Sequence, residues 1–66
     1  MATVYYIDGE LVGAKKAKEF LKERTLAAGY SLDDAEAAWA RRSRDEEARE
    51  MINNLTGSEL EVFIEE

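Results

Sequence analysis

Carboxylates concentrated toward the C-terminal end have the clearest potential for chemistry in this sequence. Residues 45–66 contain eight acidic side chains and one basic side chain, whereas residues 1–44 contain seven acidic and eight basic ones. The C-terminal segment therefore accounts for the whole excess of negative charge, which is −6 over 66 residues. Clustered carboxylates can bind cations or basic proteins, and paired carboxylates can act as general acid and base.

Catalysis and metal binding are poorly supported by the residue types. The chain contains no His and no Cys, so it lacks the commonest catalytic base and the preferred ligands of transition metals. The acidic segments 33–36 and 45–47 lack the alternating ligands and central Gly of a calcium-binding loop. Acid–base catalysis by two carboxylates needs a cleft, which 66 residues can hardly form. We therefore expect no enzymatic activity, no cofactor and no bound metal.

The spacing of the carboxylates favours a binding role instead. Glu46, Glu47 and Glu50 share one side of a predicted helix, where successive turns are about 5.4 Å apart. Glu59 and Glu61 alternate on a predicted strand at about 6.6 Å, which is twice the strand rise. These intervals approach the phosphate spacing of nucleic acid, so they predict binding to a basic nucleic-acid-binding protein. The predicted partner-binding residues are Asp45, Glu46, Glu47, Glu50, Glu59, Glu61, Phe63 and Glu65.

Two other interpretations of the surface are open. In one, the acidic residues only maintain solubility, and an apolar surface binds a second copy, forming a homo-dimer, or another protein. That apolar surface would consist of Tyr5, Ile7, Val12 and Phe63. In the other, the lysines of segment 14–28 bind nucleic acid directly, but the acidity of the whole chain argues against it. We therefore expect no direct contact with nucleic acid.

The elements that must position these residues begin with a β-hairpin. Residues 3–7 are β-branched or aromatic, and Asp8-Gly9 is a typical two-residue turn before the short strand 10–12. Alternation then predicts two apolar faces, with Val4, Tyr6 and Leu11 on one and Tyr5, Ile7 and Val12 on the other. We expect another part of the molecule to shield some of the second face, because large exposed apolar patches are rare.

Helical periodicity follows the hairpin. Residues 14–28 form an amphipathic stripe that ends at Gly29, and Ser31 is a favourable N-cap for the next helix. Apolar residues of segments 32–42 and 44–54 point in nearly opposite directions at about 100° per residue. We therefore predict two helices over these segments, the second beginning with a capping box at Ser43-Arg44-Asp45-Glu46. The alternative is one long helix that is packed on two sides.

The final segment predicts a strand. Residues 59–65 alternate with period two, which places Leu60, Val62 and Ile64 toward the core. The resulting order ββαααβ predicts an α+β fold that forms a single domain over residues 1–66. We expect a small antiparallel or mixed sheet that two to three helices cover on one face.

Two features of the whole chain bear on its cellular location and on the class of proteins that it resembles. The opening MATVYYIDGEL has no basic and apolar leader, and no apolar run approaches the roughly 20 residues of a membrane span. A Cys-free, strongly acidic chain of this size that opens VYYIDGELVGAKKAKEFL and closes ELEVFIEE resembles the small phage-encoded inhibitors of bacterial defence. These are the anti-CRISPR and anti-restriction proteins.

The resemblance covers the whole chain in size, charge and predicted α+β fold. It implies a non-enzymatic inhibitor that occupies the DNA-binding surface of a defence nuclease, such as a CRISPR effector. We therefore expect the protein to act in the cytoplasm of a bacterial host cell, without contacting the membrane.

Overall fold

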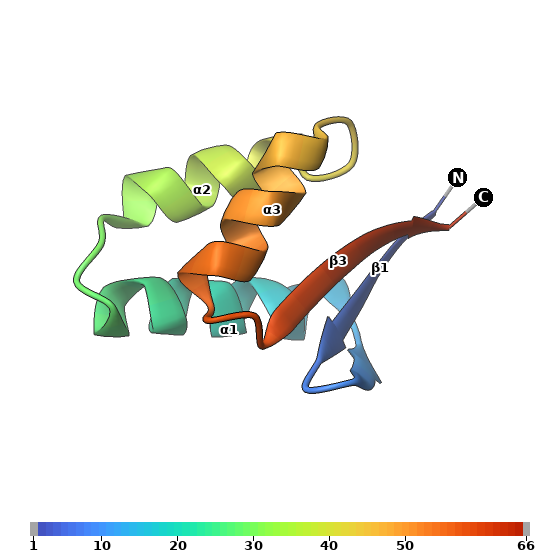
Figure 1. Cartoon of the computed structure of the whole chain (residues 1–66), viewed down its shortest axis with the longest axis horizontal. Coiled ribbons are helices and arrows are strands. Elements are labelled where there is room, and N and C mark those ends of the chain that lie inside the picture. The colour runs from blue at the N-terminus through green and yellow to red at the C-terminus, as the bar shows by residue number, and fades with distance from the viewer. Residues whose placement is uncertain (1, 66) are drawn as a thin grey trace.

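Strands at both ends of the chain enclose three consecutive helices. The computed structural model describes residues 2–65, whose elements confirm the predicted α+β fold (Figure 1). In chain order these elements are β1 (Ala2–Ile7), β2 (Glu10–Val12), α1 (Ala14–Ala27), α2 (Leu32–Arg41), α3 (Glu46–Leu55) and β3 (Leu60–Glu65).

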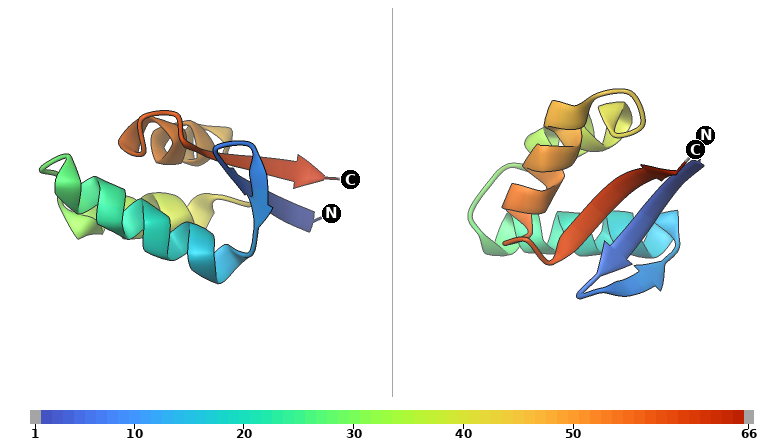
Figure 2. Two further views of the ribbon diagram at one scale, coloured as in Figure 1. Left: turned by 90° about the horizontal axis from the view of Figure 1, so that it is seen from below. Right: turned by 45° about the vertical axis from the view of Figure 1, so that its right-hand side comes forward.

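The strands form an antiparallel sheet in the order β2-β1-β3. Tyr5 of β1 pairs with Val12 of β2, as predicted, through a turn in which Asp8 and Gly9 both have positive φ. On its other side, Tyr5 pairs with Val62 of β3. The first and last strands of the chain are therefore neighbours, and β3 lies at an edge of the sheet (Figures 1 and 2).

The helices cover one face of the sheet. α1 and α3 pack against the strands, while α2 packs against both of these helices. Trp39 of α2 reaches the sheet, where its ring stacks on Tyr5 with centroids 5.3 Å apart. The core between the layers contains Tyr5, Ala17, Leu21, Ala35, Ala38, Trp39, Ala48, Ile52, Leu60 and Val62.

The other face of the sheet carries apolar side chains that none of the helices α1, α2 and α3 covers. Leu11 is 63% exposed and Phe63 is 47% exposed, although the Phe63 ring makes an edge-to-face contact with Tyr6. We call the set Val4, Tyr6, Leu11 and Phe63 the apolar sheet face.

The apolar binding surface predicted from the sequence is therefore wrong. Tyr5 is only 4% exposed, and Ile7 and Val12 pack against the helical core. Because side chains alternate along a strand, Phe63 points to the opposite face from these three residues.

The region 32–55 contains two helices, as predicted, so the alternative of one long helix is wrong. Its predicted capping box is also wrong. Asp45 is the N-cap of α3, and its Oδ1 accepts a hydrogen bond of 2.9 Å from the Glu47 amide. Backbone bonds from Arg44 and Asp45 to the Arg41 carbonyl form a turn after α2, which delays the start of α3. The Ser43 hydroxyl instead lies 2.8 Å from the Thr3 hydroxyl.

Two side chains fasten the end of α3 to the start of β3. The buried Thr56 hydroxyl donates to the Ile52 carbonyl at 3.0 Å and accepts from the Leu60 amide at 3.1 Å. The Asn53 side-chain amide donates to the Leu60 carbonyl at 3.0 Å. These bonds set the position of β3 relative to α3.

Candidate functional site

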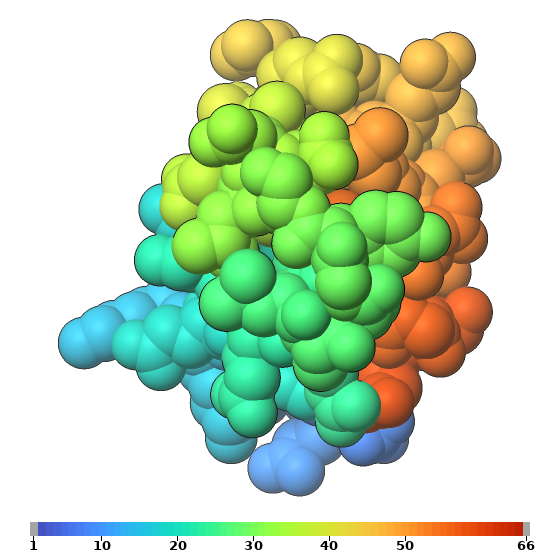
Figure 3. All heavy atoms as spheres, turned by 90° about the vertical axis from the view of Figure 1, so that its left-hand side faces the viewer, coloured from blue at the N-terminus to red at the C-terminus, as the bar shows by residue number. Residues whose placement is uncertain are grey.

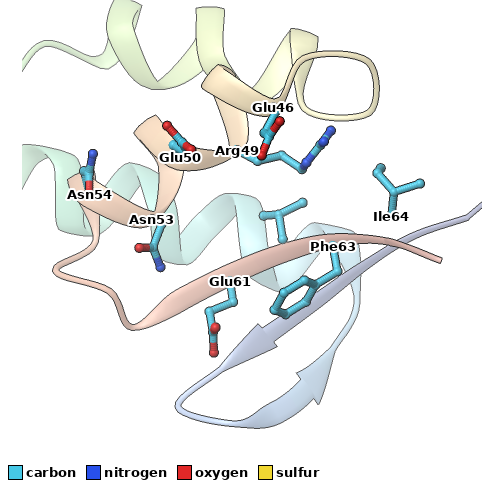
Figure 4. Close-up of a pocket in the computed structure, with 9 residues that line it drawn as sticks. Glu46, Arg49, Glu50, Asn53, Asn54, Glu61, Phe63 and Ile64 are labelled. Atoms are coloured by element: carbon cyan, nitrogen blue, oxygen red, sulfur yellow. The ribbon is translucent and has the colours of Figure 1, made fainter.

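A groove of about 530 Å³ lies between α3 and β3 (Figure 4). Its lining residues are Glu46, Arg49, Glu50, Asn53 and Asn54 from α3, and Glu61, Val62, Phe63 and Ile64 from β3. Three carboxylates and one guanidinium are the charged groups of this lining. We call it the acidic groove.

The helical side of the acidic groove follows from the amphipathic pattern of α3. Ala48 and Ile52 are buried in the core, which leaves Glu46 and Glu50 exposed on the solvent side. These two glutamates are four residues apart, so they lie one above the other on neighbouring turns. The guanidinium of Arg49 donates a hydrogen bond of 2.8 Å to the Arg42 carbonyl, which ties it to the α2–α3 connection.

The strand side of the acidic groove combines charge with an exposed aromatic ring. Glu61, Phe63 and Glu65 alternate along β3 and share the outer face of the sheet. In Figure 4, Glu46 and Glu50 lie on the α3 side of β3, whereas Glu61 and Phe63 project on the other side. The lining residues therefore lie along the outer edge of β3, on both faces of the sheet.

The structure brings together half of the predicted partner-binding residues. Glu46, Glu50, Glu61 and Phe63 line the acidic groove. Glu65 lies beyond Phe63 on the same face of β3. Within residues 2–65, Glu46, Glu50 and Glu61 take part in no ion pair, so their charges are available to a partner.

Asp45 and Glu59 serve the fold instead. The Asp45 carboxylate caps α3 and lies 3.2 Å from the Arg41 guanidinium. Glu59 precedes β3, and its carboxylate lies 3.0 Å from the guanidinium of Arg24 on α1. Both negative charges therefore already have positive partners within the molecule.

Glu47 points to a second hollow, which lies between α3 and the α1–α2 connection. Tyr30, Asp34 and Met51 also line this hollow, and Glu50 borders both it and the acidic groove. Figure 3 shows this side of the molecule, with the green α1–α2 connection beside the orange residues of α3. The predicted row of glutamates on α3 is therefore divided between two surfaces.

Basic side chains gather on a different surface, between α1 and α2. Three lysines and one arginine line a hollow there together with Trp39 and a single carboxylate, Glu19; the basic residues are Lys15, Lys18, Lys22 and Arg42. Lys18 also lies 3.4 Å from the carboxylate of Glu36. The segregation of charge along the sequence is thus also a segregation in space.

Several groove residues were missed by sequence reasoning. Arg49 and Asn53 follow Glu46 at helical spacing, which is a signal that they share its side of α3. Val62 and Ile64 were assigned only to the core, because period-two alternation shows which face a side chain occupies but not whether the strand is at an edge.

Comparisons with known proteins assign the chain to no family. No protein-family model matches it, and no curated protein or solved structure shows significant similarity to it. Among residues 2–65, no three or more His, Cys, Asp or Glu side chains are grouped so that they could hold a metal ion. No helix in this part of the chain has the length and apolar character needed to cross a membrane.

Proposed function

We propose that this protein is a non-catalytic inhibitor of a basic, nucleic-acid-binding protein complex. It binds through the acidic groove and competes with DNA for the same basic surface. The observation that carries the proposal is the set of three carboxylates without ion pairs in the described chain, Glu46, Glu50 and Glu61, beside the exposed ring of Phe63. The expected partner is a bacterial defence nuclease, such as a CRISPR effector, in the cytoplasm of the host cell.

The physical basis is competition for the same positive charges. Lys and Arg side chains that bind phosphates can bind carboxylates on a rigid scaffold, and the field of the acidic surface speeds the encounter. Glu46 and Glu50 are held about one helical turn, or 5.4 Å, apart on a helix that is packed against the core. The exposed ring of Phe63 adds apolar surface that binding would remove from water. Aromatic side chains that become buried in this way commonly anchor interfaces.

The partner can be sought by affinity capture from a bacterial lysate with elution in a salt gradient. We expect a nucleic-acid-binding complex to elute between low and moderate salt, because ions screen exposed charge pairs over about 10 Å at 0.1 M. The captured complex is then incubated with labelled duplex DNA, and increasing amounts of this protein should displace the DNA.

Charge reversal tests the site directly. In the displacement assay, Glu46→Lys with Glu50→Lys should weaken inhibition at least about tenfold, because like charges would then face each other. Glu19→Lys with Glu23→Lys is the matched control, since it makes the same change of charge on exposed positions of α1. Equal inhibition by both double variants would refute the assignment to the acidic groove.

A second candidate function is self-association or protein binding through the apolar sheet face. The observation that favours it is the exposure of Leu11 and Phe63 on a sheet face that no helix covers. Sedimentation equilibrium at high protein concentration should then give the mass of two chains, and Leu11→Glu should restore the mass of one. A wild-type mass of one chain would exclude the homo-dimer.

A further inference from the structure

The edge of β3 that faces away from β1 has backbone groups directed into the acidic groove. The amide of Asp8 donates to the Glu59 carbonyl at 2.9 Å, which places this pair at a hydrogen-bonded position of the ladder. Backbone groups point alternately toward and away from the neighbouring strand in an antiparallel pair. The amides and carbonyls of Glu61 and Phe63 therefore point to β1, and those of Leu60, Val62 and Ile64 point outward.

Within the described residues 2–65, hydrogen bonds occupy only the first part of this outer edge. Thr56 and Asn53 bind the amide and carbonyl of Leu60. Among residues 2–65, no side chain forms a hydrogen bond with the backbone of Val62 or Ile64, and both residues line the acidic groove. Asn53 lies near the C-terminal end of α3, and Figure 4 shows that β3 continues past this residue toward Ile64.

We propose that the acidic groove binds an extended, Lys- or Arg-rich segment of the partner protein as an additional strand on β3. This inference rests on the proposed function and names the mode of binding. Strand addition takes its affinity from backbone hydrogen bonds and its specificity from the alternate side chains of the added segment. Val62 and Ile64 supply the backbone groups, and the acidic side chains on both faces of the sheet select the partner.

The charges of the acidic groove define the chemistry of the added segment. On one face, its alternate side chains meet Glu61 and Glu65 on either side of Phe63, which favours basic residues flanking an apolar one. On the other face, they lie toward α3, where the carboxylates of Glu46 and Glu50 outnumber the one guanidinium, Arg49, which again favours Lys or Arg. The selected segment is therefore basic on both faces.

The same charges disfavour a second copy of this chain at the edge. An antiparallel pair of β3 strands centred on Phe63 would place Glu61 of each copy opposite Glu65 of the other. Like charges that face each other across strands are destabilising, and acidic side chains on edge strands are a common protection against self-pairing. The charge of the edge therefore favours a basic partner over the chain itself.

Amide hydrogen exchange, measured by NMR, tests the mode of binding. The probe is the capped eight-residue peptide TKKVKKTT, which places two Lys on each face of an extended strand and Val between the two Lys of one face. It is added to the intact protein at a saturating concentration. We expect exchange of the Val62 and Ile64 amides to slow at least about tenfold relative to the Glu61 and Phe63 amides, which are already bonded to β1. The last two amides are thus an internal control.

A second peptide separates strand addition from simple charge attraction. Methylation of all backbone nitrogens in the same peptide keeps its charge but removes its ability to pair as a strand. We expect at least about tenfold weaker binding and no selective protection, because methylated nitrogens cannot donate the backbone hydrogen bonds from which strand addition takes its affinity.

Two results would overturn strand addition: failure of the first peptide to bind, or binding without selective protection of Val62 and Ile64. The proposed function would still stand if Glu46→Lys with Glu50→Lys abolished displacement of DNA while the α1 control did not. Failure of both experiments would refute both proposals.

Discussion

Arg42 joins the helices to the sheet, so its replacement should measure how strongly the two layers are coupled. Its Nε donates a hydrogen bond of 2.6 Å to the Tyr5 hydroxyl, and its Nη1 donates one of 2.8 Å to the Trp39 carbonyl. The guanidinium carbon also lies 4.2 Å from the centre of the Trp39 ring. Arg42→Met keeps most of the aliphatic stem but removes both donors and the charge.

We expect Arg42→Met to lower the free energy of unfolding by about 2 kcal/mol. Hydrogen bonds to charged groups contribute about 1.5–3 kcal/mol each, but Arg42 is half-buried and water can replace part of that contribution. The cation–π contact adds about 0.5–1 kcal/mol at such a site. A chain of this length is expected to have a total stability of only about 3–10 kcal/mol, so the loss should be easily measurable.

The assay is urea denaturation at equilibrium, followed by far-UV circular dichroism and by the fluorescence of Trp39, the one Trp in the chain. Arg44→Met is the matched control, because it removes the same charge from an exposed position of the same turn. We expect the control to change stability by less than about 0.5 kcal/mol. Equal midpoints for Arg42→Met and Arg44→Met would refute the coupling role of Arg42.

A double-mutant cycle isolates the bond to Tyr5. Tyr5→Phe removes only the hydroxyl, so its effect and that of Arg42→Met should be non-additive by about 1 kcal/mol. Additive effects would show that the bond of 2.6 Å makes no net contribution to stability.

Three further predictions concern positions that set the site, and urea denaturation checks each. Asp45→Ala should cost about 1 kcal/mol by removing the cap of α3, while Ser43→Ala should cost less than half of that; the reverse order would contradict the cap assignment. Thr56→Val should cost about 2 kcal/mol, because the buried Leu60 amide loses its acceptor; an unchanged midpoint would show that another group replaces it. Leu21→Ala should cost about 2–5 kcal/mol by leaving a cavity in the core, and a loss below about 1 kcal/mol would contradict close packing there.

Sequence reasoning predicted most of the fold because its signals are local. The Asp8-Gly9 turn, the Ser31 cap and the positive-φ Gly29 that follows α1 each depend on a few neighbouring residues. The phase change between the apolar residues of segments 32–42 and 44–54 correctly separated α2 from α3. The start of α3 was mispredicted because Ser43 and Asp45 are both good caps, and the turn after Arg41 decided between them.

The candidate site was only partly predictable. The sequence determined by itself that the C-terminal segment is acidic and that Glu61, Phe63 and Glu65 share a face, because charge and strand alternation are local properties. Only the tertiary structure decided which carboxylates meet. Packing of the Ala48 and Ile52 side of α3 against the core left Glu46 and Glu50 beside the groove, and Arg24, which is distant in sequence, neutralised Glu59.

The order of the strands was also determined by the tertiary structure. Alternation in residues 60–65 is the same for a central strand and for an edge strand, so the sequence determined the faces of β3 but not its neighbours. Pairing of β3 with β1, on the side opposite β2, left the outer backbone groups of Val62 and Ile64 directed toward the acidic groove. The physical reason is that strand order depends on how distant segments bury their apolar faces together, whereas turns, caps and alternation depend on near neighbours.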